Sequence, residues 1–501
     1  MKVICGGMIC DGTGSVPEKK TMLIDGEYIV GFLPDGAPLP EGAEKIDASG
    51  LLVCPGFIDS HAHSDLKKLI YPELKTKLLQ GVTTEVLGNC GASGYMARNS
   101  AGGYEWDGFK GYIDALAQSR QSVNSVCLCG HNSIRYIVMK YDDRPPTSAE
   151  LDAMKGLIRD ALDLGAAGFS TGLVYLPGKY SDTEEVKALA SCLKGTGKVY
   201  ASHIRGEGDT LLDAVDEAIA VAKAGNATLE ISHLKTFMPR NFGKIDALIE
   251  KIETARVAGI RVFADRYPYI YSCTGMRQLL PPPYDKIAKV SDFLKESDAH
   301  FKEVVEALKH SPRDVPTTIV CEGKYRGCVL ADAAKYGMSS EELAATIIRD
   351  EPSVHGAFLC MSEDNMRKIL SRSWVSAGSD GMSYQLDNTE DFMHPRSAGT
   401  FPLFFRIVSE MCGIAEAVRR MTSLPAEVFG IPKRGVLKEG YYADVAIFDG
   451  DAFNSVGDYH GGNQAPVGMR YVLVAGKVAY DSESPNEIGR FGSYIPISSA
   501  I

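Results

Sequence analysis

The chain has 501 residues, which is too long for one simple hydrophobic core, so two or more domains are expected. Hydrophobic residues make up 45% and charged residues 23%, as in ordinary globular proteins. The net charge of −11 disfavours nucleic acid or an anionic membrane as the main partner. A small anionic substrate stays open, because the local charge of a pocket decides its binding.

The chain shows no targeting segment that would place it outside the cytoplasm. The N-terminal residues lack the long apolar run of a secretory signal, and no segment approaches the roughly 18 apolar residues of a membrane-spanning helix. The twelve cysteines are scattered without the dense spacing of a disulfide framework. We therefore expect reduced thiols and a cytoplasmic location.

The two ends of the chain have β character. Short strand-like runs and turns fill residues 1 to about 50, and Asp25-Gly26 is typical of a hairpin. Strand-like runs return at 443–448 and 469–474. The N-terminal segment is too short to hold a good core alone. The simplest prediction is one small β-sandwich domain built from residues 1–53 and 416–501.

Between the ends, strand-like runs alternate with amphipathic helical stretches. The helix expected at 148–164 has Ser148 as its N-cap. This alternation is typical of a parallel sheet, and about eight units without a glycine-rich dinucleotide motif favour a (β/α)8 barrel over residues 54–415. The strands are expected at 51–53, 82–87, 125–130, 167–170, 199–202, 228–232, 261–265 and 373–377.

The barrel region is longer than a barrel needs, which is about 250 residues. The surplus is expected at 275–351, which holds a proline triplet at 281–283 and polar helical segments such as 286–308. We interpret 275–351 as an insertion on the catalytic side of the barrel, near the active site.

Metal-binding residue types follow several of the expected strands. In such a barrel, residues at the carboxyl ends of the strands converge on one site. Each alone has an ordinary explanation, such as a core histidine, a small buried cysteine or a turn aspartate. Together they predict a metal site, and nitrogen and sulfur ligands with a carboxylate suit zinc. The six residues are His61, His63, Cys90, His203, His233 and Asp380.

Several motifs carry a family resemblance over nearly the whole chain. General marks are PGFIDSHAH from Pro55 and Ser379-Asp380, and narrower ones are GNCG at 88–91, SHIRGEGD at 202–209, ISHLK at 231–235, YPY at 267–269 and HPRSAGTFP at 394–402. With these motifs the chain resembles the amidohydrolase superfamily and, within it, the D-aminoacylase, or N-acyl-D-amino-acid deacylase, family.

The resemblance implies a zinc-dependent enzyme that hydrolyses the amide bond of N-acyl-D-amino acids by metal-bound hydroxide. It implies one tightly bound Zn²⁺ held by Cys90, His203 and His233. It implies a second, weaker metal position formed by His61, His63 and Asp380. Asp380 would also be the general acid and base.

The resemblance also implies residues that bind the substrate. A free carboxylate needs a fixed cation, and an arginine offers a bidentate fork. Arg266 departs from the family pattern, and it either faces an acidic substrate side chain or forms a buried salt bridge. The residues implied for the carboxylate and acyl regions are Lys235, Arg396, Tyr175 and one of Tyr267 or Tyr269.

Two other functions on the same fold are alternatives to deacylation. Many superfamily members carry a carboxylated lysine on the fourth strand, where this chain has Ser170 and Thr171. That difference argues against a cyclic-amide hydrolase of the dihydropyrimidinase or dihydroorotase type. The complete ligand set argues against a non-catalytic scaffold on the same fold. The sequence leaves open the preferred side chain, the acyl group, strict D-stereospecificity, one metal against two, and the oligomeric state.

Overall fold

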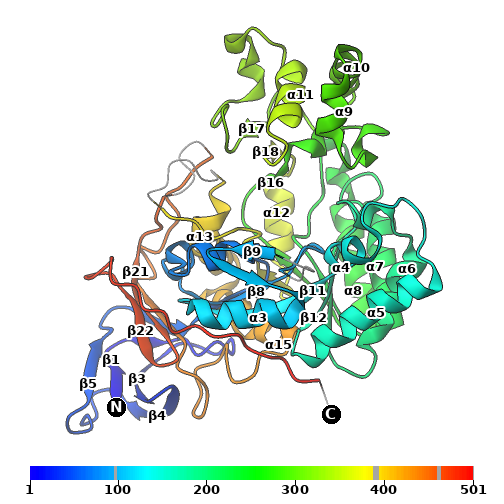
Figure 1. Ribbon diagram of the computed structural model, residues 1–501. Coiled ribbons are helices and arrows are strands. Elements are labelled where there is room, and N and C mark those ends of the chain that lie inside the picture. Colours follow the sequence, from blue (N-terminus) through cyan, green and yellow to red (C-terminus); the bar gives the residue numbers. More distant parts are fainter. Residues whose placement is uncertain (95–98, 387–393, 460–463, 500–501) are drawn as a thin grey trace.

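Eight parallel strands form a nearly closed barrel in the computed structural model, which describes residues 1–94, 99–386, 394–459 and 464–499 (Figure 1). Each strand pairs in parallel with the next. The predicted (β/α)8 barrel is therefore confirmed. In pairing order the strands are β7 (Phe57–Asp59), β8 (Val82–Leu87), β11 (Asn124–Gly130), β12 (Gly168–Gly172), β13 (Val199–His203), β14 (Thr228–Ile231), β15 (Val262–Arg266) and β19 (Val375–Ala377).

The first and last strands join just beyond their carboxyl ends. Ala62 and Gly381 form a parallel bridge, and the backbone N–H of Asp380 donates to the carbonyl of His61 at 2.8 Å. The closure therefore brings two segments about 320 residues apart to the same edge, where barrel enzymes carry their sites.

One expected strand lies in a different sheet. The apolar run at 51–53 belongs to β6 (Leu52–Pro55), which pairs with strands of the β domain, so the prediction that it opens the barrel is wrong. The barrel begins after Gly56, whose N–H donates to the carbonyl of Asp444. A Cβ at Gly56 would lie 2.2 Å from Thr83 Oγ1, so the chain needs glycine to make this passage between the domains.

Helices surround the barrel and pack apolar faces against its strands. The cap of α5 is Thr147, not Ser148 as predicted, because Thr147 and Glu150 form a reciprocal capping box. The helices are α1 (Lys67–Ile70), α2 (Lys75–Leu78), α3 (Gly108–Ser119), α4 (His131–Met139), α5 (Ser148–Asp163), α6 (Thr183–Ala190), α7 (Leu211–Gly225), α8 (Ile245–Val257), α12 (Glu363–Leu370), α13 (Arg396–Cys412), α14 (Ile414–Met421) and α15 (Ser423–Phe429). A small hairpin joins β9 (Asn99–Ala101) to β10 (Tyr104–Trp106).

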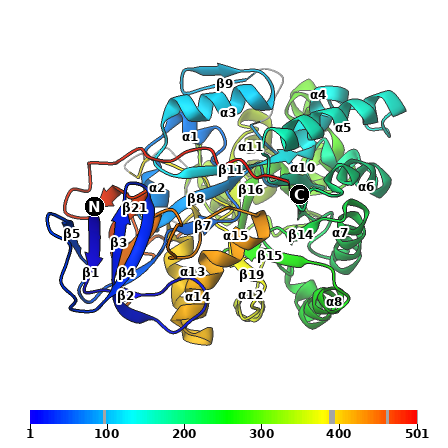
Figure 2. The same cartoon turned by 90° about the horizontal axis from the view of Figure 1, so that it is seen from below.

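The two chain ends build one β domain, as predicted. The pairing of β6 with β20 joins them, and Figure 2 shows the blue N-terminal strands beside β21. The nine strands form one sheet around a core that includes Ile4, Met22 and Val445. The strands are β1 (Lys2–Cys5), β2 (Met8–Ile9), β3 (Glu18–Asp25), β4 (Tyr28–Pro34), β5 (Glu44–Asp47), β6, β20 (Val445–Phe448), β21 (Met469–Val474) and β22 (Lys477–Asp481).

The inserted segment forms a lobe with its own apolar core (Figure 1, green). Its antiparallel sheet has the order β16 (Tyr271–Gly275), β18 (His355–Leu359), β17 (Ile319–Val320). The helix expected over 286–308 is divided into α9 (Val290–Glu296) and α10 (Asp298–Leu308), because Ser297 between them is extended and caps α10. α11 (Ser340–Asp350) completes the lobe.

The boundaries 1–53, 54–415, 416–501 and 275–351 stay predictions. α14, which spans the predicted boundary at 415, and α15, which follows it, both pack against the barrel strand β7, and α14 also packs against β19. Within the described residues, no helix combines the length and the apolar character needed to cross a membrane.

Candidate metal centre and active site

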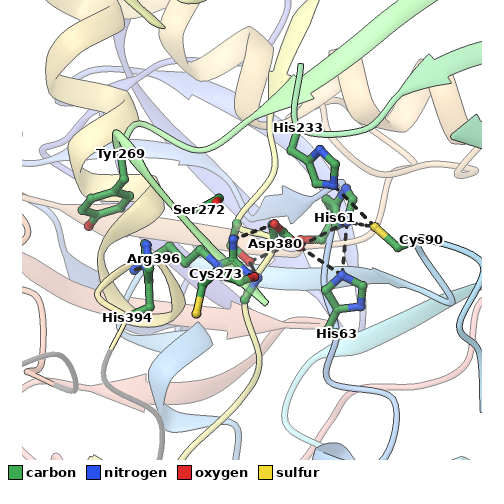
Figure 3. A network of polar contacts seen from close by, with 12 residues as sticks. His61, His63, Cys90, His233, Tyr269, Ser272, Cys273, Asp380, His394 and Arg396 are labelled. Carbon is green, nitrogen blue, oxygen red and sulfur yellow. Dashed lines mark hydrogen bonds and ion pairs between the residues drawn. The ribbon is translucent and has the colours of Figure 1, made fainter. Parts of the chain in front are cut away.

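The predicted metal ligands converge where the barrel strands end, and Figure 3 labels all of them except His203. His203 is the last residue of β13, Cys90 and His233 follow β8 and β14 by a few residues, and Asp380 follows β19. The Sγ atom of Cys90 lies at the centre of the group. Its distances are 3.3 Å to His61 Nε2, 3.7 Å to His203 Nδ1 and 3.5 Å to His233 Nε2.

The spacing of these donors fits zinc. A Zn–S bond of about 2.3 Å and a Zn–N bond of about 2.0 Å at a tetrahedral angle separate S and N by about 3.5 Å. The distances from Cys90 Sγ to His203 Nδ1 and His233 Nε2, 3.7 and 3.5 Å, agree with that value. Each of these two imidazoles is therefore spaced from the Cys90 thiolate as two zinc ligands are.

A second group of donors shares the same space. His63 Nε2 lies 3.3 Å from His61 Nε2 and 3.0 Å from Asp380 Oδ1. Asp380 Oδ1 is also 3.5 Å from His61 Nε2. Ligand atoms of His61, Cys90, His233 and Asp380 all lie within 4.8 Å of one another. The two predicted metal positions are therefore adjacent, with Cys90 between them.

The backbone at three of these residues is in the left-handed region. Cys90 has φ +52°, His233 has φ +38° and Asp380 has φ +49°. Residues other than glycine rarely adopt this conformation, and it persists where the surroundings impose it, often at functional sites. Each strained residue directly follows a strand or a short turn after one, so the strain turns its side chain toward the shared centre.

Charge interactions favour the ionised forms of Cys90 and Asp380 in this centre. Burial raises the pKa of the Cys90 thiol, but the imidazoles of His61 and His233 outweigh it and hold the pKa well below its usual value. The thiolate is the form that binds metals. Burial also opposes ionisation of Asp380, but Arg396 and His233 hold the pKa of its carboxyl well below its usual range. Asp380 is therefore a carboxylate.

Two carboxylates contact the histidine nitrogens that face away from Cys90, and neither of them was predicted from the sequence. Asp265 Oδ2 is 2.8 Å from His61 Nδ1, and Asp265 Oδ1 accepts from the backbone N–H of His233 at 3.0 Å. Glu207 Oε1 is 3.1 Å from His233 Nδ1. The available signals were an aspartate at an expected strand end and a glutamate inside the SHIRGEGD motif.

A buried ion network beneath the site was also missed. Lys77 Nζ lies 2.7 Å from Asp59 Oδ2 and 3.3 Å from Glu85 Oε1, and Lys68 Nζ lies 2.9 Å from Glu85 Oε2. All four charged side chains are fully buried. Asp59 Oδ1 also accepts from the backbone N–H of Ser379 at 2.9 Å, so the network fixes the turn that carries Asp380.

The two cations implied for substrate binding lie beside the centre. Arg396 starts α13 and donates from Nη1 to Asp380 Oδ2 at 2.6 Å and from Nη2 to the carbonyl of Cys273 at 3.1 Å. Lys235 Nζ contacts Glu207 Oε1 and lies 2.8 Å from His233 Nδ1. Both cations are buried, so each is held in one orientation by these partners.

The two tyrosines of the YPY motif differ in their surroundings. The Tyr267 ring lies 5.0 Å from the Arg396 guanidinium, and its buried hydroxyl has no hydrogen-bond partner among the described residues. The Tyr269 hydroxyl lies 3.2 Å from Ser455 Oγ, on the side of the C-terminal segment. Tyr267 is therefore the better placed of the two for a ligand of Arg396. The Tyr175 ring packs against His203 at 4.8 Å between centroids.

Arg266 is buried behind Tyr267. Its guanidinium lies 4.5 Å from the Tyr267 ring, and Nη2 donates to the carbonyl of Tyr269 at 3.0 Å. In the described part of the chain, neither Nε nor Nη1 has a hydrogen-bond partner. The predicted contact with an acidic substrate side chain therefore stays a prediction.

Comparisons with known proteins agree with this geometry. Residues 44–344 and 405–480 match the model of the amidohydrolase family. An N-acyl-D-glutamate deacylase of Alcaligenes xylosoxydans xylosoxydans is 33% identical, over 97% of this chain and 94% of its own length. The structure of N-acyl-D-glutamate deacylase from Bordetella bronchiseptica, complexed with zinc and a phosphonate mimic of the tetrahedral intermediate, is 31% identical with a TM-score of 0.83 and covers 99% of each chain.

A further structure, of a D-aminoacylase studied for its binuclear metal centre, is 28% identical with a TM-score of 0.84 and also covers 99% of each chain. The family match, the full-length relative and the full-length structural similarity agree with one another and with the ligand set at the strand ends. The chain belongs to the amidohydrolase family.

Proposed function

We propose that this protein is a zinc-dependent N-acyl-D-amino-acid deacylase, which hydrolyses a linear amide to a free D-amino acid and a carboxylate. The observation that carries the proposal is the spacing of Cys90, His203 and His233, which suits zinc, beside a buried carboxylate and a buried arginine. The full-length relatives named for deacylation of N-acyl-D-glutamate and for D-aminoacylase activity support the same reaction.

Cys90, His203 and His233 would hold one Zn²⁺ tightly, and His61, His63 and Asp380 would form a weaker second position. When bound, zinc activates a water molecule at neutral pH and polarises the amide carbonyl. Asp265 would orient His61 for the weaker metal position, because the Asp265 carboxylate accepts a hydrogen bond from His61 Nδ1.

Asp380 is the proposed general acid and base. Its Oδ1 faces the imidazoles of His61 and His63, and its Oδ2 is held by Arg396. Because its pKa is low, the carboxylate is available to take a proton from the attacking water. The same oxygen then delivers the proton to the departing amine nitrogen.

Arg396, Lys235 and Tyr267 are the proposed contacts of the substrate α-carboxylate. Arg396 Nε and the Tyr267 hydroxyl have no hydrogen-bond partner among the described residues, so each keeps an unused donor. A carboxylate placed against both would receive charge-assisted hydrogen bonds in a buried setting. Tyr175, which packs on His203, would line the acyl end.

An acidic side chain is the proposed preference of the substrate. Arg266 supports it, because a buried guanidinium with two unused donors is costly unless a ligand pairs with it. Two relatives, both N-acyl-D-glutamate deacylases, support it as well. Because the Tyr267 ring covers the guanidinium, a direct contact requires that ring to shift.

A cyclic-amide hydrolase is the alternative within the family. Such an enzyme is expected to carry a carboxylated lysine on the fourth barrel strand, which is β12 in this chain. At that place Ser170 donates to the carbonyl of Gly88, and the hydroxyls of Thr171 and Ser202 form a hydrogen bond of 2.9 Å. Both hydroxyls are therefore engaged inside the barrel. The absence of a lysine on β12 supports a linear amide as the substrate over a cyclic one.

A substrate panel tests the proposed reaction. Purified zinc-loaded protein is assayed with N-acetyl-D- and N-acetyl-L-amino acids bearing acidic, apolar and basic side chains, and with hydantoin and dihydroorotate. We expect hydrolysis of the D series, fastest for acidic side chains. Turnover of only the L series, or of only the cyclic amides, would refute the proposal.

The cysteines support a reducing compartment, such as the cytoplasm, as the place of the reaction. All twelve are free thiols. Structural disulfides accumulate in exported proteins, whereas cytoplasmic thiols stay reduced.

A further inference from the structure

Glu207 contacts both histidines that are proposed to hold the tight zinc. It lies in the loop between β13 and α7, and its side chain is only 13% exposed. Oε1 is 3.1 Å from His233 Nδ1, and Oε2 is 3.8 Å from His203 Nε2. The opposite nitrogens, His233 Nε2 and His203 Nδ1, face Cys90 Sγ. Glu207 is therefore behind the ligands, on the side away from the metal.

This placement bears on which nitrogen of His233 carries its proton. A neutral imidazole has one N–H and one lone pair, and a metal binds the lone pair. Because Nε2 faces Cys90, metal binding requires the proton on Nδ1. A carboxylate at Nδ1 accepts that N–H and so favours the metal-binding form.

Lys235 favours the opposite form. Its Nζ lies 2.8 Å from the same His233 Nδ1, and an ammonium only donates hydrogen bonds. A donation from Lys235 to Nδ1 would require the lone pair there and the proton on Nε2, where it blocks the metal. Glu207 Oε1 contacts Lys235 Nζ as well as His233 Nδ1, so one oxygen can accept from both groups.

We propose that Glu207 is a positioning residue that selects the metal-binding tautomer of His233 and engages the Lys235 ammonium that would otherwise donate to the same nitrogen. The inference rests on the proposed zinc site, but not on the identity of the substrate. A separate cation held by His203, Glu207 and His233, whose ligand atoms also cluster, is disfavoured because the Lys235 ammonium lies within their contacts.

The test is a double-mutant cycle on zinc affinity, measured by competition with a chelator on full-length protein without substrate. Glu207→Ala is expected to weaken zinc binding by about 10- to 100-fold, the usual effect of losing an outer-shell partner. Lys235→Met alone is expected to leave zinc affinity within about 3-fold of the wild type, since its loss removes a competitor. Glu207→Ala with Lys235→Met is expected to bind zinc about tenfold more tightly than Glu207→Ala.

The controls separate this role from a general structural one. Glu217 is similarly buried, with 11% of its side chain exposed, and it pairs with Arg205 instead of a histidine. Glu217→Ala should leave zinc affinity unchanged. Glu207→Gln, which keeps one acceptor oxygen, should retain part of the affinity, and it replaces Glu207→Ala in the cycle if the alanine variant does not fold.

Two results would overturn the proposal: unchanged zinc affinity in Glu207→Ala, or no recovery when Lys235→Met is added. Failure of the proposed function would look different. A wild-type protein that binds zinc and shows the cycle but does not hydrolyse N-acyl-D-amino acids would refute the reaction and leave the role of Glu207 intact.

Discussion

The guanidinium of Arg396 donates to the carboxylate of Asp380, with 2.6 Å between Nη1 and Oδ2. The cation proposed to bind the substrate therefore also orients the proposed general base. Asp380 Oδ2 is occupied by this bond, and Oδ1 is the oxygen directed to the imidazoles of His61 and His63. The proposed substrate-binding cation and the proposed general base thus form one ion pair.

Asp380→Asn should lower kcat by about 10²- to 10⁴-fold, because the amide cannot accept the proton of the attacking water. Zinc should stay bound, since Cys90, His203 and His233 are unchanged. Steady-state kinetics and metal analysis of the same preparation check both statements. Asp246→Asn, at an exposed carboxylate, serves as the control and should retain full activity. Near-normal turnover in Asp380→Asn would contradict the assignment.

Cys90→Ser should lower the zinc content from about one tightly held ion per chain toward zero, because zinc prefers thiolate to a serine hydroxyl. Metal analysis after gel filtration with a chelator measures the change. Cys129→Ser is the matched control, since Cys129 is also a buried free thiol but is not among the clustered ligand residues. Full zinc retention in Cys90→Ser would mean that the tight site lies elsewhere.

Arg396→Lys should reduce kcat/KM by about 10- to 100-fold, because lysine keeps the charge but loses the fork, and a hydrogen bond to a charged group contributes about 1.5–3 kcal/mol. The comparison that isolates the α-carboxylate uses an N-acetyl-D-amino acid and its amide. We expect the wild type to prefer the free acid strongly and the variant to lose much of that preference. An undiminished preference would exclude Arg396 from carboxylate binding.

Arg266→Met should reduce kcat/KM for N-acetyl-D-glutamate and N-acetyl-D-aspartate by about tenfold or more and leave N-acetyl-D-leucine nearly unchanged. The reason is that methionine fills the space but cannot pair with a second carboxylate. The readout is the ratio of kcat/KM for each acidic substrate to kcat/KM for N-acetyl-D-leucine, measured in parallel for the wild type and the variant. A uniform loss across all three substrates would instead assign Arg266 to the support of Tyr267.

Glu85→Gln should destabilise the metal-free protein by about 3–5 kcal/mol at pH 7, because Lys68 and Lys77 would lose their shared buried partner. Burial raises the pKa of Glu85, but the two ammonium groups outweigh it and lower the pKa. Its contribution is therefore present above the unfolded-state pKa of about 4.3 and is lost as the pH falls through the lower folded-state value.

Denaturant unfolding of both proteins from pH 7 to pH 3 measures this difference. The gap in the free energy of unfolding between wild type and Glu85→Gln should be constant near neutrality and should narrow on acidification. A gap that is independent of pH would show that packing, and not the ion pairs, explains the loss.

Local patterns in the sequence were sufficient for most of the regular structure. The strand expected at 82–87 coincides with β8 and the one at 469–474 with β21, because a short run rich in β-branched and apolar residues bounded by turn residues is a local property. The residue types at the strand ends were equally visible, and they determined the chemistry of a zinc site and the family.

Other features depended on contacts between distant parts of the chain. The apolar run in β6 could pair with either sheet, and only its partners β2 and β20 place it in the β domain. Lys77 and Ser379 lie 302 residues apart in sequence, so no local pattern could predict their hydrogen bond. A buried charge is stable only beside its partner, and that partner is known only after folding.

The sequence by itself determined the barrel, the joined β domain and the ligand types. The tertiary structure decided which nitrogen of each histidine faces Cys90 and which faces Asp265 or Glu207. The physical reason is that an imidazole has two inequivalent nitrogens, and their roles are set by neighbours from other strands. Residue identity names a possible ligand, but only packing across the barrel orients it.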